Sequence, residues 1–270
     1  LYPLAPFNSF ELKETRGEAI ELAKDLLSEQ KINIKDYSIE GFLQNSPIEN
    51  KYLIKKLGNE DYKKVLKTKD WAFYGWEIIF HKNLDRNIPQ NTYIIKVNQN
   101  GKITSFEYNL SDTVKMASVS SEEAEKTIKA FSLSYFKINL EEYSLVETKE
   151  EKYVNRIDHK FTWEKKIPSL NSVNEITAVV QGDKPGSFQN NLRVPDTYRN
   201  YFETGQIVFV TASILFIFFW MIKAFFIFIK KYHQGEVWLN LGTTLFLIFI
   251  FTSLIVLINY WPALGQGFTI

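Results

Sequence analysis

The sequence predicts an α+β fold of two similar units, followed by two transmembrane helices. One observation is a break in composition near Gly205: charged residues are frequent before it, and Phe, Ile and Leu dominate after it. Another is a pair of matching helix-start signals, at Thr15 and Ser120, each followed by amphipathic sequence. The third is Asn100-Gly101 between two β-rich segments, which is a strong signal for a hairpin turn.

The two helix starts have the form of a capping box. Thr15 is followed three residues later by Glu18, and Ser120 by Glu123, so that the hydroxyl and the carboxylate each accept a backbone amide of the first turn. Each helix is expected to bury one face. The expected buried positions are Ala19, Ala23, Leu26 and Leu27 in the first helix and Ala124, Ile128, Phe131 and Tyr135 in the second.

A second signal repeats after each helix at nearly the same offset. Residues 31–39 and 137–145 share the tripeptide Lys-Ile-Asn and the dipeptide Tyr-Ser. The repeat predicts a duplication into units 10–112 and 113–195, each with one helix packed on a small antiparallel sheet. An insertion at 49–69, rich in Lys and Glu, is expected to form one or two surface helices of the first unit.

Strand-like sequence in both units runs into a Trp-Glu pair. These pairs are Trp76-Glu77 and Trp163-Glu164, and we take them as equivalent positions. The second unit is expected to turn at 183–186, in place of the Asn-Gly turn of the first unit.

Two apolar segments are each long enough to cross a bilayer. Residues 208–229 and 239–260 would each rise roughly 33 Å as helices, against a hydrocarbon core of about 30 Å. Lys223 lies in the first segment near its end, where its ammonium can reach the interface. A role for Lys223 in an ion pathway is the alternative, but neither segment supplies an acidic partner.

The distribution of basic residues predicts the orientation. The connecting loop 230–236 contains two lysines and lies near Lys223, whereas Arg193 and Arg199 precede the first span. The positive-inside rule places the loop in the cytoplasm and residues 1–205 outside it, in a multi-pass protein of the cell membrane.

Composition argues against several function classes. The chain has 32 basic and 31 acidic residues, so it lacks the positive surface that nucleic-acid binding requires. It has no cysteine, which removes thiolate metal sites and cysteine nucleophiles. Phosphate-binding loops, dinucleotide fingerprints and the nucleophile elbow are absent.

No catalytic, cofactor-binding or metal-binding residue is assigned. His81, His159 and His233 are too scattered for a local ligand pair. Strand alternation places His159 on an apolar face, which favours a core histidine over a catalytic one. Arg156 and Asp158 lie two apart on the other face, and we interpret them as a structural pair.

The combination of repeated units, the run from Arg156 to Glu164 and the membrane spans resembles the N-terminal extension of certain bacterial CPBP-family intramembrane proteases, which are related to CAAX prenyl endopeptidases. The two units resemble PepSY-type domains. That family has a Glu-Glu-x-x-x-Arg helix, a Phe-x-x-x-His helix and a further membrane histidine. Glu122-Glu123 lacks the arginine and neither span contains histidine, so no catalytic residue carries over.

The resemblance implies an extracytoplasmic accessory region with the first membrane helices of a multi-pass peptidase. Because the sequence begins with Leu1 and ends in apolar residues, we expect a piece of a longer protein whose catalytic core, with any metal it uses, lies beyond Ile270. The expected partners are the lipid bilayer and a peptide or membrane-protein substrate. The alternative function is a non-enzymatic, membrane-anchored peptide-binding or sensor protein whose sheet edges capture an extended segment.

Overall fold

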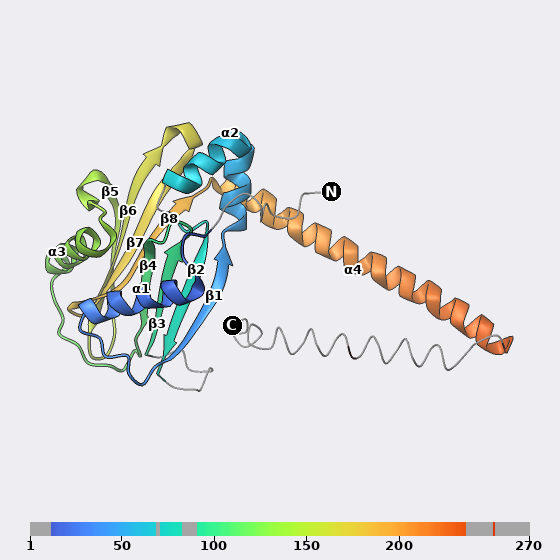
Figure 1. Ribbon diagram of the computed structural model, residues 1–270, viewed down its shortest axis with the longest axis horizontal. Helices are drawn as coiled ribbons and strands as arrows, with labels where there is room; N and C mark the ends of the chain where they lie inside the picture. The colour runs from blue at the N-terminus through green and yellow to red at the C-terminus, as the bar shows by residue number, and fades with distance from the viewer. Residues whose placement is uncertain (1–11, 69–70, 83–90, 236–250, 252–270) are drawn as a thin grey trace. The chain divides into compact units, whose positions relative to one another are not determined.

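Eight antiparallel strands form one sheet in the order β1-β2-β3-β4-β8-β7-β6-β5 (Figure 1). The computed structural model describes residues 12–68, 71–82, 91–235 and 251. The chain divides into two compact units, Leu1–Arg199 and Asn200–Ile270, and the sheet belongs to the first. The strands are β1 (Ser38–Asn45), β2 (Tyr74–His81), β3 (Thr92–Asn98), β4 (Ile103–Asn109), β5 (Ser144–Lys152), β6 (Ile157–Ile167), β7 (Ser172–Gln181) and β8 (Lys184–Arg193).

Helices α1 (Arg16–Glu29) and α3 (Ser121–Phe131) begin at the two predicted caps. Both capping boxes are formed, with Thr15 bonded to Glu18 and Ser120 to Glu123. The predicted buried positions are confirmed, except that Tyr135 is only partly buried and lies in the π-helical turn after α3. The shorter helical turns are η1 (Ser132–Phe136), η2 (Leu140–Glu142) and η3 (Pro168–Leu170).

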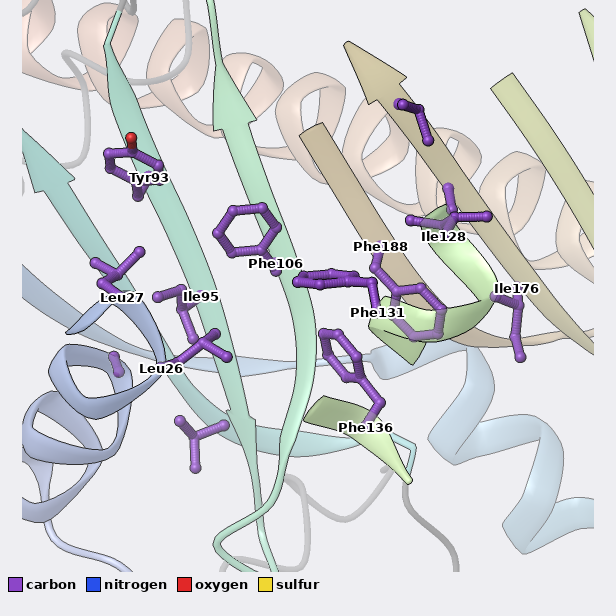
Figure 2. Close-up of a cluster of buried hydrophobic side chains, with 14 of the residues drawn as sticks. Leu26, Leu27, Tyr93, Ile95, Phe106, Ile128, Phe131, Phe136, Ile176 and Phe188 are labelled. Carbon is purple, nitrogen blue, oxygen red and sulfur yellow. The ribbon is translucent and has the colours of Figure 1, made fainter. Parts of the chain in front are cut away.

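The main core lies between one face of the sheet and the two helices α1 and α3. Side chains from seven of the eight strands alternate onto this face, which is the period-two pattern of a sheet with one covered face. Figure 2 shows where its aromatic members meet: Phe131 and Phe136 from the second helical segment lie beside Phe106 of β4 and Phe188 of β8.

The strand order has an internal pseudo-symmetry. Each helix is followed by four antiparallel strands, and the last strands of the two sets, β4 and β8, pair with each other. Phe106 lies opposite Phe188, and the flanking pairs Ser105–Gln189 and Glu107–Ser187 are exchanged by a two-fold rotation at this point. The predicted boundary at 112/113 falls between β4 and α3, and the duplication remains an interpretation of this arrangement.

The register also corrects one predicted equivalence. Phe80 pairs with Ile39 and Tyr93, as Trp163 pairs with Leu145 and Ile176, so Phe80 has the position that Trp163 has. The equivalence of Trp76 and Trp163 is therefore wrong. Trp76 instead corresponds to His159, because Trp76 lies opposite Val97 and His159 opposite Val180, each at a bulge of the following hairpin.

The second hairpin turns earlier than the sequence suggested. Gly182 and Asp183 connect β7 to β8, with Gly182 at a φ of +60°. Lys184, Pro185 and Gly186 already belong to β8, so the prediction of a turn over 183–186 is wrong in its position. The strand tolerates Pro185 because its pairing with Val180 follows a register shift.

The inserted segment forms α2 (Pro47–Thr68), which changes direction at Gly58, where φ is +75°. The two helical pieces were expected, but α2 does not lie only on the surface, because some of its side chains are buried. It buries Leu53, Tyr62 and Leu66 in a second apolar cluster with residues of both strand sets. The other members of this cluster are Trp71, Phe73, Tyr74, Leu170 and Leu192.

Helix α4 (Asp196–His233) contains the predicted span 208–229. By length and composition it is the one helix among the described residues that could cross a membrane, with a mean hydropathy of 2.4. The other predicted span, 239–260, lies outside the described residues except for Phe251. A multi-pass topology therefore stays a prediction.

Candidate binding cleft

The insertion builds a cleft at one end of the sheet. Tyr52 of α2 donates a hydrogen bond to the carbonyl oxygen of Leu170 at 2.7 Å, which joins the inserted helix to the second strand set. At the other end of α2, the carbonyl oxygen of Leu66 accepts from Gln99 and Asn100 in the β3–β4 turn, at 2.9 and 2.8 Å. The cleft beside the start of α2 has a volume of about 200 Å³. Its lining residues are Ser46, Glu49, Trp71, Ala72, Phe73, Glu175, Asn190, Asn191, Leu192, Arg193 and Arg199.

One side of the cleft is an open strand edge. Strand β8 pairs with β7 from Lys184 to Arg193, but with β4 only from Ser187 to Gln189. In the part of the chain that the structure describes, residues 190–193 are therefore paired with a strand on one side only. These four residues line the cleft, so the backbone edge that lacks a second ladder lies at its wall.

Asn190 supplies a polar group inside the cleft. Its side chain is only 6% exposed, and its Oδ1 atom has no hydrogen-bond partner within the described residues. The comparison with Asn174 on β7 is direct, because that amide is satisfied. Asn174 accepts from the indole of Trp71 at 2.9 Å and donates to the hydroxyl of Tyr143 at 2.8 Å. A buried acceptor without a partner is costly, and this one belongs to a residue in the wall of the cleft.

Two arginine–glutamate pairs line the cleft. Arg193 is held by Glu164 at 2.6 Å and also by Glu175. Arg199, in the first turn of α4, contacts Glu49 of α2 at 3.0 Å. Three carboxylates and two guanidinium groups take part in these contacts, so the charged groups at the cleft carry no excess of positive charge.

The pseudo-symmetric counterpart of this edge is closed by the protein itself. The two-fold rotation that relates Phe106 to Phe188 places Tyr108 where Asn190 lies in the second set. The carbonyl oxygen of Tyr108 accepts a hydrogen bond from Gln181 at 3.2 Å, and its ring stacks on Tyr93 with centroids 4.3 Å apart. Only the β8 end carries the inserted helix, and this difference accounts for a cleft there.

The predicted structural pair, Arg156 and Asp158, is confirmed and lies elsewhere. Both side chains are buried, and the guanidinium Nε lies 3.0 and 3.1 Å from the two carboxylate oxygens. Arg156 also donates to the carbonyl oxygen of Ser111 at 2.6 Å, which ties the connection between the strand sets to β6. Burial raises the pKa of Asp158 above its ordinary value, while Arg156 and the amide of Gly182 act in the opposite direction.

The histidines do not form a site. His159 is a core residue, as expected: it is 1% exposed, with Nε2 lying 2.9 Å from the carbonyl oxygen of Val119. The expectation that its ring is fully hydrogen-bonded is met at Nε2 only, because the buried Nδ1 has no hydrogen-bond partner among the described residues. His81 lies 3.4 Å from Glu40 at the other side of the sheet, and His233 ends α4. Glu122 and Glu123 lie in the first turn of α3, as a helix start predicts. Within the described ranges, no group of three histidine, aspartate or glutamate side chains could hold a metal ion.

Comparison with family models, with curated proteins and with solved structures finds no match. The cleft residues were not singled out in the sequence. Asn190 and Asn191 lie in a polar strand, and their significance depends on where β4 stops pairing with β8. The insertion was the available signal, since a long segment between two strands of one unit commonly carries function.

Proposed function

We propose that this chain is a membrane-anchored module that binds an extended polypeptide segment by adding it as a strand beside β8. The observation that carries the proposal is the edge at 190–193, which is paired with a strand on one side only and lines a cleft beside the unsatisfied, buried amide oxygen of Asn190. Backbone pairing would supply affinity, and the side chains of the cleft would select among segments. The apolar floor formed by Phe73 and Leu192 suits a small aliphatic side chain.

Helix α4 would hold the module at the bilayer. The apolar composition of this helix and the lysines at its far end support an anchor with residues 1–205 on the extracytoplasmic side. The resemblance to CPBP-family proteases supports a more specific role, as the accessory region of a multi-pass intramembrane peptidase. A Glu-Glu-x-x-x-Arg helix encoded downstream of Ile270 would support that role, and a stop codon directly after Ile270 would contradict it.

Strand addition can be tested without a known ligand. Peptides of about nine residues with random sequence, long enough to form one strand, are displayed on phage and selected against the full chain in lipid nanodiscs. The matched competitor is the Asn190→Leu variant, which keeps the size of the side chain and removes the amide. We expect sequences that bind the native chain and bind the variant about tenfold more weakly, the effect of one lost hydrogen bond to a buried partner.

Two results would contradict the proposal. One is a selection in which no sequence is enriched over empty nanodiscs. The other is enrichment of peptides that bind the Asn190→Leu variant as tightly as the native chain, which would place the binding site elsewhere on the molecule.

A further inference from the structure

The two ends of the sheet differ in how well they are protected against pairing with another strand. Figure 1 shows β1 at one end of the sheet and β5 at the other. Five of the nine residues of β5 are charged, and its ladder is interrupted by a bulge after Leu145. Charged side chains and bulges keep an edge strand from pairing with other chains. By contrast, β1 has one charged residue among eight, Glu40, and pairs with β2 without interruption from Ser38 to Asn45.

The unprotected edge also carries apolar side chains that the fold does not use. Leu43 is 53% exposed, and the neighbouring Phe42 is only partly buried. Phe42 lies opposite Glu77, whose carboxylate pairs with Lys96 at 3.2 Å, so the ring lies on a polar face of the sheet. Neither Phe42 nor Leu43 belongs to the two apolar clusters of the described residues. Adjacent apolar residues on an uninterrupted edge strand are the feature that strand addition buries.

Gly41 leaves room for a side chain beside the same strand. A Cβ atom built at Gly41 would lie 3.1 Å from the side chains of both Arg16 and Ile78, so this position faces α1. Leu43, two residues further along, lies on the same face because strand residues alternate. A glycine inside a strand weakens it and often marks a place where another backbone approaches closely. The stretch therefore offers a gap and a protruding leucine on one face.

We propose that β1 pairs with β1 of a second copy of this chain, antiparallel, about a two-fold axis that passes beside Phe42. In this register Phe42 lies opposite Phe42 of the second copy, Gly41 opposite Leu43, and Glu40 opposite Gln44. Each leucine then occupies the space beside the glycine of the other copy. The contact is isologous, because the same surface serves both copies. The inference is independent of the cleft and adds a homodimer to the proposed function.

The sequence of β1 favours this register over its neighbours. Directly opposed residues of an antiparallel pair point to the same face, so a two-fold axis has to lie at a residue. An axis at Glu40 would oppose two carboxylates, and one at Gly41 would place Glu40 against Phe42. An axis at Leu43 would place the ring of Phe42 against the amide of Gln44. The register at Phe42 instead forms an aromatic pair and sets a carboxylate opposite Gln44, whose Nε2 has no hydrogen-bond partner among the described residues.

The register is tested by cross-linking. The chain has no native cysteine, so Phe42→Cys gives a single thiol in each copy. Opposed Cα atoms of antiparallel strands are about 4.5–5.5 Å apart, which a disulfide can bridge. We expect oxidation of the full chain in lipid vesicles to link this variant into a dimer.

Two matched variants control for random collision. Ser38→Cys lies on the same strand, but its two copies would be eight residue spacings apart, roughly 26 Å, and should not link. Thr148→Cys, which is exposed on β5, should not link either. Linkage of either control to the same extent as Phe42→Cys would overturn the proposed register.

The contribution of the edge to association is tested by adding a charge. Sedimentation equilibrium of the full chain in detergent should show a dimer, and Leu43→Lys should abolish it at the same protein concentration. Leu145→Lys, at an exposed leucine of β5, should leave the dimer intact. Near-ultraviolet circular dichroism shows whether both variants keep the native fold, and the cross-linking test does not depend on them. A native chain that stays monomeric, or a dimer that survives Leu43→Lys, would overturn the inference.

Discussion

Phe106 and Phe188 lie directly opposite each other where β4 meets β8, and both rings are fully buried. This pair is the centre of the pseudo-symmetry, because the strand pairs on either side of it exchange under a two-fold rotation. The cleft lies to one side of this centre, at the point where the pairing of β4 with β8 stops and β8 continues. The short pairing between β4 and β8 therefore determines which residues of β8 are paired on one side only.

Asn190 and Asn174 are expected to respond oppositely to the same substitution. Asn190→Leu removes an unsatisfied buried acceptor and should raise the free energy of unfolding by roughly 1 kcal/mol. Asn174→Leu removes the hydrogen bonds that Asn174 makes with Trp71 and Tyr143 and should lower it by about 1–3 kcal/mol. Urea unfolding of the full chain in detergent, followed by tryptophan fluorescence, measures both. A loss of stability in Asn190→Leu would show that this amide is structural.

The buried pair between Arg156 and Asp158 should be sensitive to the loss of one partner. Arg156→Met leaves a carboxylate in a dry environment and frees the carbonyl oxygen of Ser111, so we expect a loss of about 3–5 kcal/mol. Lys165→Met, which removes an exposed pair with Glu142, provides the control and should change little. Thermal unfolding monitored by near-ultraviolet circular dichroism distinguishes them. Equal effects would mean that burial adds nothing at Arg156.

The first capping box should make stability depend on acid pH. The backbone amide of Thr15, followed by its hydroxyl, holds the pKa of Glu18 below its ordinary value of 4.5. The folded state therefore gains from the ionised carboxylate above the unfolded pKa, and this gain disappears as the pH falls through the folded pKa. Glu18→Gln should be less stable than the native chain at neutral pH, and the difference should shrink as the pH falls below the ordinary value of 4.5.

A second glutamate variant controls for the change in net charge. Glu29→Gln removes a carboxylate from the last residue of α1, which has no part in the capping box. Unfolding free energies measured in urea across the acid range should show the pH-dependent difference for Glu18→Gln only. The same dependence in both variants would attribute it to net charge.

Topology can be measured with single cysteines because the chain has none of its own. A cysteine at Gln234 should react with a membrane-impermeant maleimide only after the membrane is opened. One at Asn59, exposed on α2, should react in cells whose outer barrier is permeable. This result follows from the lysines at the far end of α4. The reverse labelling would place the strand-rich unit in the cytoplasm.

The sequence predicted those parts of the fold that depend on local signals. Both capping boxes, the buried helix faces and a hairpin turn at Asn100-Gly101 follow from contacts between residues close in the chain. The two-residue turn that Asn-Gly predicts is wrong in its length, because the four residues 99–102 join β3 to β4. The buried state of His159 followed from strand alternation. The pairing of the two strand sets into one sheet could not be predicted from local signals. Phe106 and Phe188 are far apart in the sequence, and each could equally have belonged to a separate sheet.

The other two errors have physical causes. Trp76 and Trp163 match in sequence, but register is fixed by pairing along the whole ladder, and a match of two residues cannot show which strand positions lie opposite each other. The second turn was assigned to Pro185 and Gly186, which are common turn residues, whereas Gly182 adopts the left-handed conformation that the turn requires. The cleft was missed because its residues come from α2, two strands and α4.

The pairing of β4 with β8 also constrains how the chain is made. Strand β8 is the last of the eight to be synthesised, and β4 has no neighbour on that side until it arrives. The nascent first half therefore presents an unpaired edge in the middle of the future sheet, with Phe106 beside it, throughout the synthesis of α3 to β7. Such an edge is a template for pairing with other chains. A chaperone that keeps this half apart from its neighbours until Lys184–Arg193 emerges would protect the most vulnerable stage of folding.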